Sequence, residues 1–107
     1  MSRTLDTAKR LVQEGAIRVS EHGYDELAAD DIFVRELIEG IGDAILVEDY
    51  PEYPKGPCVL VLETDRMDRP IHVVWGIPKD QTTPAVLVTA YRPDPALWEV
   101  GFSRRKQ

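Results

Sequence analysis

Apolar residues recur every three or four positions in the N-terminal part of the chain, which is the spacing of an amphipathic helix. The first such set comprises Leu5, Ala8, Leu11 and Val12. It predicts a helix over residues 4–14, and Gly15 provides the stop signal. A second helix is expected through EHGYDELAA with Ser20 as its N-cap, followed by a third that Asp30 or Asp31 caps. The AIRVS segment between the first two helices is a short strand or an extended link.

The spacing of apolar residues changes to two after the third predicted helix. AILVEDY, CVLVLETD, IHVVWGIP and AVLVTAYRP each read as a strand. Their connections are shorter than the dozen or so residues that a parallel crossover needs, so neighbouring strands are expected to be antiparallel. The sequence therefore predicts one α+β domain over residues 1–107, with N-terminal helices packed on a four-stranded, mostly antiparallel sheet.

The segment after the last predicted strand, DPALWEVGFSRRKQ, begins with turn-forming residues. We expect Trp98 and Phe102 to pack it back onto the domain, and the basic residues 103–107 to fray. No apolar run approaches the roughly 20 residues that span a bilayer, and the first residues lack the apolar centre of a signal peptide. These features predict a cytoplasmic protein with no membrane partner.

Charge is distributed unevenly along the chain, whose formal net charge is −6. Residues 1–53 contain 5 Lys or Arg and 13 Asp or Glu, whereas residues 54–107 contain 8 and 6. Nucleic-acid affinity comes mostly from cations that neutralise phosphates, so the overall sign disfavours general nucleic-acid binding. A local basic patch on the second half stays open as an alternative.

The residues that bind metals and cofactors are sparse. The chain has one cysteine, Cys58, which excludes an internal disulfide and a cysteine-rich zinc site and is expected to be a buried structural thiol. His22 and His72 are 50 positions apart and show no spacing typical of metal ligands. No phosphate-binding glycine loop or nucleophile elbow is present. We therefore expect neither a metal site nor a cofactor.

Both histidines lie where acid–base chemistry is feasible. His72 is expected on the third strand, on the face opposite Trp75, where its imidazole suits proton transfer near neutral pH. His22 opens the second helix, whose positive end favours a neutral imidazole that can act as a base. The alternative for each is a structural histidine held by local or cross-strand hydrogen bonds.

The last predicted strand ends with two further candidates. Tyr91 is expected to share a face with Ala85, Leu87 and Thr89, and Arg92 follows at the strand end. A tyrosine can transfer a proton or stack on a base, and an arginine can hold a phosphate through two hydrogen bonds. A half-buried aromatic residue and a solvated end charge are the alternative.

Four stretches occur in a fixed order: IRVSEHGYDELAADDI, AILVEDYPEYPKGPCVLVL, RPIHVVWGI and VLVTAYRPDPALW. Together they resemble the family catalogued as domain of unknown function 4258, over about residues 17–98. The resemblance implies N-terminal helices on a curved antiparallel sheet, a fold grouped with RelE-like and barnase-like ribonuclease toxins. It also implies RNA cleavage without metal. By position, His22 matches the family's helix-start histidine, His72 its strand histidine, and Thr89 and Tyr91 its final strand motif.

The chain departs from this family pattern in its second helix. Many relatives carry arginines there, at the places where this chain has Glu26 and Asp30. Acidic side chains oppose the negative charge that develops on phosphorus during RNA cleavage. The resemblance therefore supports the fold more strongly than the activity.

Two functions stay open at this point. The first is a toxin-type ribonuclease that acts on RNA or the ribosome and has a cognate antitoxin. In it His22 is the base, His72 or Tyr91 the acid, and Arg92 and Thr89 contact the substrate. The second is a non-catalytic acidic module on the same fold, which binds a protein partner. Convergence of the two histidines and Arg92 in one cleft would favour the first.

Overall fold

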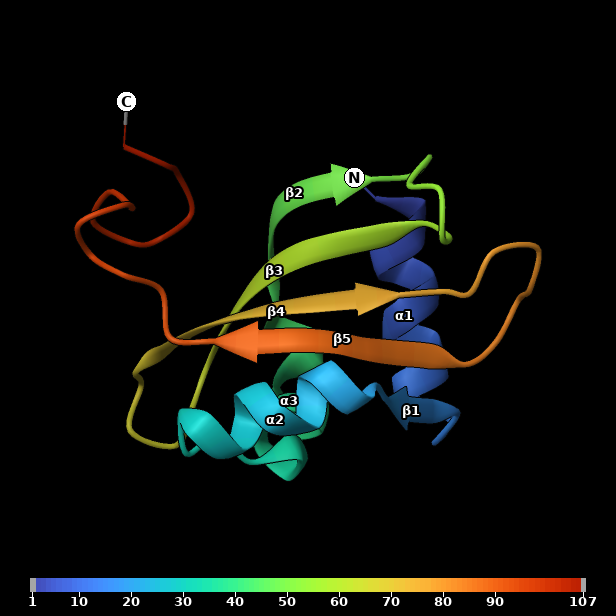
Figure 1. The fold of residues 1–107 in the computed structure, drawn as a ribbon, viewed down its shortest axis with the longest axis horizontal. Helices are drawn as coiled ribbons and strands as arrows, with labels where there is room; N and C mark the ends of the chain where they lie inside the picture. The colour runs from blue at the N-terminus through green and yellow to red at the C-terminus, as the bar shows by residue number, and fades with distance from the viewer. Residues whose placement is uncertain (1, 107) are drawn as a thin grey trace.

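The computed structural model describes residues 2–106, and within them three α-helices and a short 3-10 helix accompany five strands (Figure 1). In chain order the elements are α1 Arg3–Gln13, β1 Ile17–Val19, α2 Glu21–Ala29, α3 Val34–Gly40, η1 Ile41–Asp43, β2 Ile45–Tyr50, β3 Cys58–Thr64, β4 Pro70–Gly76 and β5 Ala85–Tyr91. The α+β class is confirmed, and helix 4–14 is observed at Arg3–Gln13.

The sheet is five-stranded and mixed, with strand order β1-β5-β4-β3-β2. The prediction of four strands is wrong because the short AIRVS segment forms β1 at one edge. β1 pairs in parallel with residues 85–87 of β5, while the other neighbours are antiparallel. The three residues of β1 are too few for their alternation of apolar and polar side chains to identify a strand. Their pairing also depends on residues of β5 that lie more than sixty positions later in the chain.

The hydrophobic core lies between one face of the sheet and the helices, with α1 as the largest helical contributor and further residues from α2, α3 and η1. α1 is placed behind β3, β4 and β5 in Figure 1. From β4, Ile71, Val73 and Trp75 are fully buried on this face. The Ser2 side chain begins α1 by accepting a hydrogen bond from the Leu5 amide at 3.1 Å. The expected core face of β4 is therefore the observed one, and His72 lies on the opposite face.

α2 runs alongside β5, next to the place where β1 ends (Figure 1). Ser20 is its N-cap, as predicted, and accepts from the Gly23 amide at 2.9 Å. A Cβ atom at position 23 would lie 2.9 Å from the Leu87 carbonyl oxygen, so the glycine allows the helix to approach the strand closely. α3 differs from the prediction: its N-cap is Phe33, which makes no side-chain cap, rather than Asp30 or Asp31.

A β-bulge in β5 changes which side chains face the core. Val74 of β4 pairs with Thr89, but the next residue, Trp75, pairs with Leu87, so Val88 is an extra residue in β5. The Ser20 hydroxyl donates to the Val88 carbonyl at 2.8 Å. The prediction that Thr89 and Tyr91 share a face with Leu87 is therefore wrong. The bulge turns them to the face opposite α1, and Ala90 becomes a core residue.

Residues 93–106, which we call the tail, turn back beside the end of β5 at the left of Figure 1. Within the tail, the Glu99 amide donates to Arg104 and the Lys106 amide to Leu97, each at 2.8 Å. Trp98 is buried, as expected from its apolar ring. Of residues 103–107, which were expected to fray, 104–106 take part in hydrogen bonds or a strand-like bridge, and Gln107 lies outside the described residues.

Candidate functional site

His72 is fully buried on the sheet face opposite α1, and other groups contact both of its ring nitrogens. Its Nε2 lies 2.7 Å from the carbonyl oxygen of Phe102, and its Nδ1 lies 3.4 Å from the Tyr91 hydroxyl. A carbonyl oxygen only accepts hydrogen bonds, so Nε2 carries the proton and Nδ1 is the acceptor for the phenol. The register of the sheet makes this contact, because His72 and Tyr91 are direct cross-strand partners.

Two residues of the tail continue this cluster outward from His72. The Trp98 ring lies edge to face with the imidazole at a centroid distance of 4.3 Å. The guanidinium of Arg105 lies over the Trp98 ring, 4.6 Å from its centre. Arg105 also forms an ion pair with Glu48 of β2 at 3.2 Å. The tail is thereby joined to β4 through His72 and to β2 through Glu48.

The surroundings of the cluster set its protonation states. Burial lowers the pKa of His72, although the Phe102 hydrogen bond and Glu48 act in the opposite direction. Burial raises the pKa of Tyr91. The hydrogen bond from Arg105 lowers the pKa of Glu48, with a further contribution from Tyr50. At neutral pH the cluster thus holds a neutral imidazole, a neutral phenol and an ionised Glu48–Arg105 pair.

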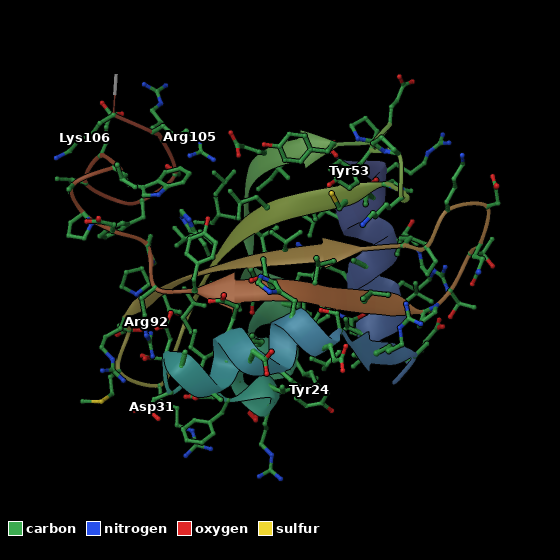
Figure 2. The ribbon with its side chains drawn as sticks, in the orientation of Figure 1. Tyr24, Asp31, Tyr53, Arg92, Arg105 and Lys106 are labelled. Carbon is green, nitrogen blue, oxygen red and sulfur yellow. The ribbon has the colours of Figure 1, made fainter. Side chains whose placement is uncertain are left out.

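A cavity of about 380 Å³ lies beside this cluster. It is lined by Val47, Glu48, Trp98, Glu99, Ser103, Arg104 and Arg105. Arg105 and Lys106 lie together at the upper left of Figure 2, on the outer part of the tail. The cavity therefore brings together an indole, two guanidinium groups and the carboxylates of Glu48 and Glu99, and within it Arg105 is paired with Glu48 and lies over the indole ring.

His22 lies apart from this cluster. Its side chain is 67% exposed and faces Glu26 at 3.6 Å on the next turn of α2. In the part of the chain that the structure describes, no hydrogen bond, ion pair or ring contact links His22 to His72 or Tyr91. In Figure 2, α2, which carries the labelled Tyr24, lies low in the view, away from Arg105. The structure does not bring the two histidines together in one contact network.

Arg92 is held in place by groups of the protein. Its guanidinium contacts the Asp65 carboxylate at 3.0 Å and the Pro70 carbonyl at 3.5 Å, and its amide donates to Asp30 at 3.2 Å. Asp30, which was expected to cap α3, instead accepts this hydrogen bond from the Arg92 amide. Thr89 is half-buried beside Tyr91 on the same face of the sheet. Arg92 therefore fixes the end of β5 to the β3–β4 hairpin.

Asp65 is the centre of that hairpin. It is buried and accepts hydrogen bonds from the amides of Met67 and Arg69 at 2.8 and 3.0 Å, and from the Arg69 guanidinium at 2.9 Å. Burial acts to raise the pKa of Asp65, but the hydrogen bonds from Arg69 and Met67 outweigh it and lower the pKa to about 2. This carboxylate is charged and fully occupied by structural partners.

Glu63 is a second buried carboxyl group, on the core side of β3. Its Oε2 accepts from the Trp75 indole at 3.1 Å, while Oε1 has no partner among the described residues. Burial raises the pKa of Glu63 to about 7, against a smaller lowering by the Trp75 bond. The sequence contained a signal for this position, because Glu63 continues the alternation of Val59 and Val61 on the core face.

The sequence interpretation missed three members of the His72 cluster as site residues: Glu48, Trp98 and Arg105. Trp98 was expected to pack, and a buried indole in a terminal segment is a signal that the segment covers something. Arg105 was assigned to a fraying basic end. No signal in the sequence alone pairs it with Glu48, 57 positions earlier.

Metal and membrane features are sparse in the described part of the chain. Residues 2–106 contain no group of three or more His, Cys, Asp or Glu side chains arranged to hold a metal ion. None of the described helices combines the length and apolarity needed to cross a bilayer. Cys58 is half-buried at the start of β3, and burial raises the pKa of its thiol.

Comparison with known proteins gives one match. A family model described as "Domain of unknown function (DUF4258)" matches residues 19–92, which extend from the end of β1 to the residue after β5. Neither the curated proteins nor the solved structures give a match. The matched segment contains His22, His72, Thr89, Tyr91 and Arg92, whereas the tail lies beyond it.

Proposed function

The chain belongs to the DUF4258 family, and from that premise we propose that it is a toxin-type, metal-independent ribonuclease whose acid–base pair is His72 and Tyr91. The family description carries no activity, so the proposal rests on the site and on the grouping of this family with RelE-like and barnase-like toxins that the sequence resemblance implies. Its substrate is RNA, free or on the ribosome, and its regulatory partner is a cognate antitoxin.

The observation that carries the proposal is the contact between His72 and Tyr91 beside a cavity lined by Arg104 and Arg105. Metal-independent RNA cleavage needs a base, an acid and a cation. The imidazole takes the proton of the 2′-hydroxyl, whose oxygen bonds to phosphorus. The bond from phosphorus to the 5′ oxygen then breaks, and that oxygen takes a proton from the phenol. A guanidinium stabilises the charge that develops on the phosphate.

The proposal differs from the sequence expectation in two residues. His22 is replaced by Tyr91 as the partner of His72, because His22 has no contact with the cluster. Arg92 is replaced by the tail arginines, because the buried carboxylate of Asp65 holds the guanidinium of Arg92, whereas Arg105 pairs with the more exposed Glu48. Thr89 keeps its place beside Tyr91 as a substrate contact.

The test is cleavage of a broad set of RNAs, with and without ribosomes, in the presence of a chelator. The proteins are wild type, His72→Ala, His22→Ala and Trp98→Ala, the last of which lacks the ring that covers His72. We expect His72→Ala to lose roughly 10²–10⁴-fold in rate and His22→Ala to cleave like wild type. Absence of cleavage by both folded wild type and folded Trp98→Ala would contradict the proposal.

A second function, a non-catalytic binding module, is supported by the separation of His22 from His72, by the engagement of Arg92 with Asp65 and by the acidity of the α2–α3 region. Residues 21–43 contain eight Asp or Glu and one Lys or Arg, and they include the exposed aromatic residues Tyr24 and Phe33. A non-catalytic module would use this region to bind a basic protein partner. In that case a charge reversal such as Glu26→Lys would weaken partner binding, whereas His72→Ala would leave it unchanged.

A further inference from the structure

We propose that the tail is an autoinhibitory latch that closes the His72–Tyr91 site. When the tail moves off the imidazole the substrate can enter, and Arg105, released from Glu48, contacts its phosphate from the displaced tail. The regulatory purpose of the latch rests on the proposed ribonuclease function. The closure itself is a property of the geometry and can be tested without RNA.

The tail covers the imidazole that the chemistry requires. The Phe102 carbonyl accepts a hydrogen bond from Nε2 of His72, and the Trp98 ring lies edge to face with the imidazole. His72 is fully buried although it lies on the sheet face that α1 does not cover. In this arrangement a substrate cannot reach the imidazole unless the tail moves.

The tail is built to move as a unit. Each backbone–backbone hydrogen bond of the described residues after Arg92 joins one tail residue to another, as between Glu99 and Arg104 or between Lys106 and Leu97. Swinging the tail away from the sheet therefore keeps these bonds intact. The hydrogen bonds that must break on opening are the one at His72 and those between Arg105 and Glu48. The buried Trp98 ring also loses its packing against His72.

The connection between the tail and β2 is weak. The side chains of Arg105 and Glu48 are 58% and 30% exposed, and ion pairs with this degree of exposure are screened by solvent. The exposed ion pair therefore adds little to the closure, which depends mainly on the buried Trp98 ring and on the His72–Phe102 hydrogen bond.

The experiment measures the rate at which diethyl pyrocarbonate modifies each histidine of the full-length protein, followed by mass spectrometry. His22 is exposed and serves as an internal standard in the same molecule. In wild type we expect His72 to react at least about tenfold more slowly than His22, in line with its burial. Glu48→Gln removes the charge that holds Arg105 and should raise the rate at His72 by about two- to fivefold.

Trp98→Ala should raise the rate at His72 by at least about tenfold, because it removes the ring over the imidazole. The matched control is Glu14→Gln, which removes a similar exposed ion pair with Arg10, at 3.3 Å, on α1. It should change neither rate. Hydrogen exchange at β4 and β5 verifies that each variant is folded.

The latch is overturned if His72 reacts as fast as His22 in wild type. It is also overturned if both folded variants, Glu48→Gln and Trp98→Ala, leave the rate at His72 unchanged. Faster modification of His72 in these variants without any RNA cleavage would support the latch and reject the ribonuclease, so the two proposals fail separately.

Discussion

The Nε2 atom of His72 lies 2.7 Å from the carbonyl oxygen of Phe102, a residue 30 positions later in the chain. This short contact fixes the neutral tautomer with the proton on Nε2, and leaves the Nδ1 lone pair toward Tyr91. The tail thus determines which ring nitrogen of the imidazole can act as a hydrogen-bond acceptor.

Tyr91→Phe should leave the tautomer of His72 unchanged, because Phe102 rather than Tyr91 holds the Nε2 proton. The 3.4 Å contact that is lost is long, so the free energy of unfolding should fall by no more than about 1 kcal/mol. Nitrogen chemical shifts of the imidazole, recorded by NMR in both proteins, report the tautomer. A proton on Nδ1 in the variant would contradict the assignment.

Glu63→Gln should stabilise the protein at alkaline pH. The pKa of Glu63 is raised from 4.5 to about 7 in the folded state, so the native protein favours the protonated form. Stability is therefore retained below pH 4.5 and is lost as the pH rises through about 7. At pH 8 we expect the variant to gain up to roughly 3 kcal/mol relative to wild type, and little or nothing near pH 4.

Urea denaturation at several pH values measures this difference. The exposed Glu52→Gln is the control, which should show no such change between pH 4 and pH 8. A stability difference for Glu63→Gln that does not vary with pH would show that the carboxyl group does not titrate in this range.

Asp65→Asn should have the opposite pH dependence. The pKa of Asp65 is lowered from 3.8 to about 2 on folding, so its contribution is fully present above pH 4 and is lost as the pH falls toward 2. At pH 7 the variant should lose roughly 2 kcal/mol, and the loss should shrink in acid. Asp68→Asn, on the exposed turn of the same hairpin, provides the control. Equal losses for the two variants would reject a special role for Asp65.

Ser20→Ala should destabilise the protein more than Ser2→Ala. Each serine caps a helix, and loss of a cap costs about 1 kcal/mol. Ser20 also donates to the carbonyl of the bulged residue Val88, so its removal leaves that acceptor without the bond and adds about 1 kcal/mol. Chemical denaturation of the two variants gives the comparison. Equal effects would mean that the bulge does not depend on Ser20.

The fold was predictable where short-range patterns determine it. The period-two alternation of Ile71, Val73 and Trp75 identified β4 and its core face correctly. The alternation in β5 led to a wrong prediction of the face on which Thr89 and Tyr91 lie. The bulge at Val88 depends on pairing with β4 and on the Ser20 hydroxyl, 68 positions away. The alternation of apolar and polar residues in a sequence does not show the extra residue of a β-bulge, so no local signal marks its position.

The candidate site was predictable only in part for a related reason. His72 and Tyr91 were singled out individually, and their contact follows from strand register, which short segments specify weakly. The roles of Glu48 and Arg105 depend on how the tail folds back. The engagement of Arg92 by Asp65 likewise joins two turns that are 27 positions apart. Such long-range pairings of charges leave no periodic trace in a single sequence.

The parallel pairing of β1 with β5 affects the order in which the chain can assemble during synthesis. Residues 17–19 leave the ribosome early, yet their partners at 85–87 are made only after β2, β3 and β4. The partner strand of β1 is therefore absent until most of the chain has been synthesised. The antiparallel β2–β3–β4 meander can form first, and β1 docks in a late, entropically costly step when β5 arrives.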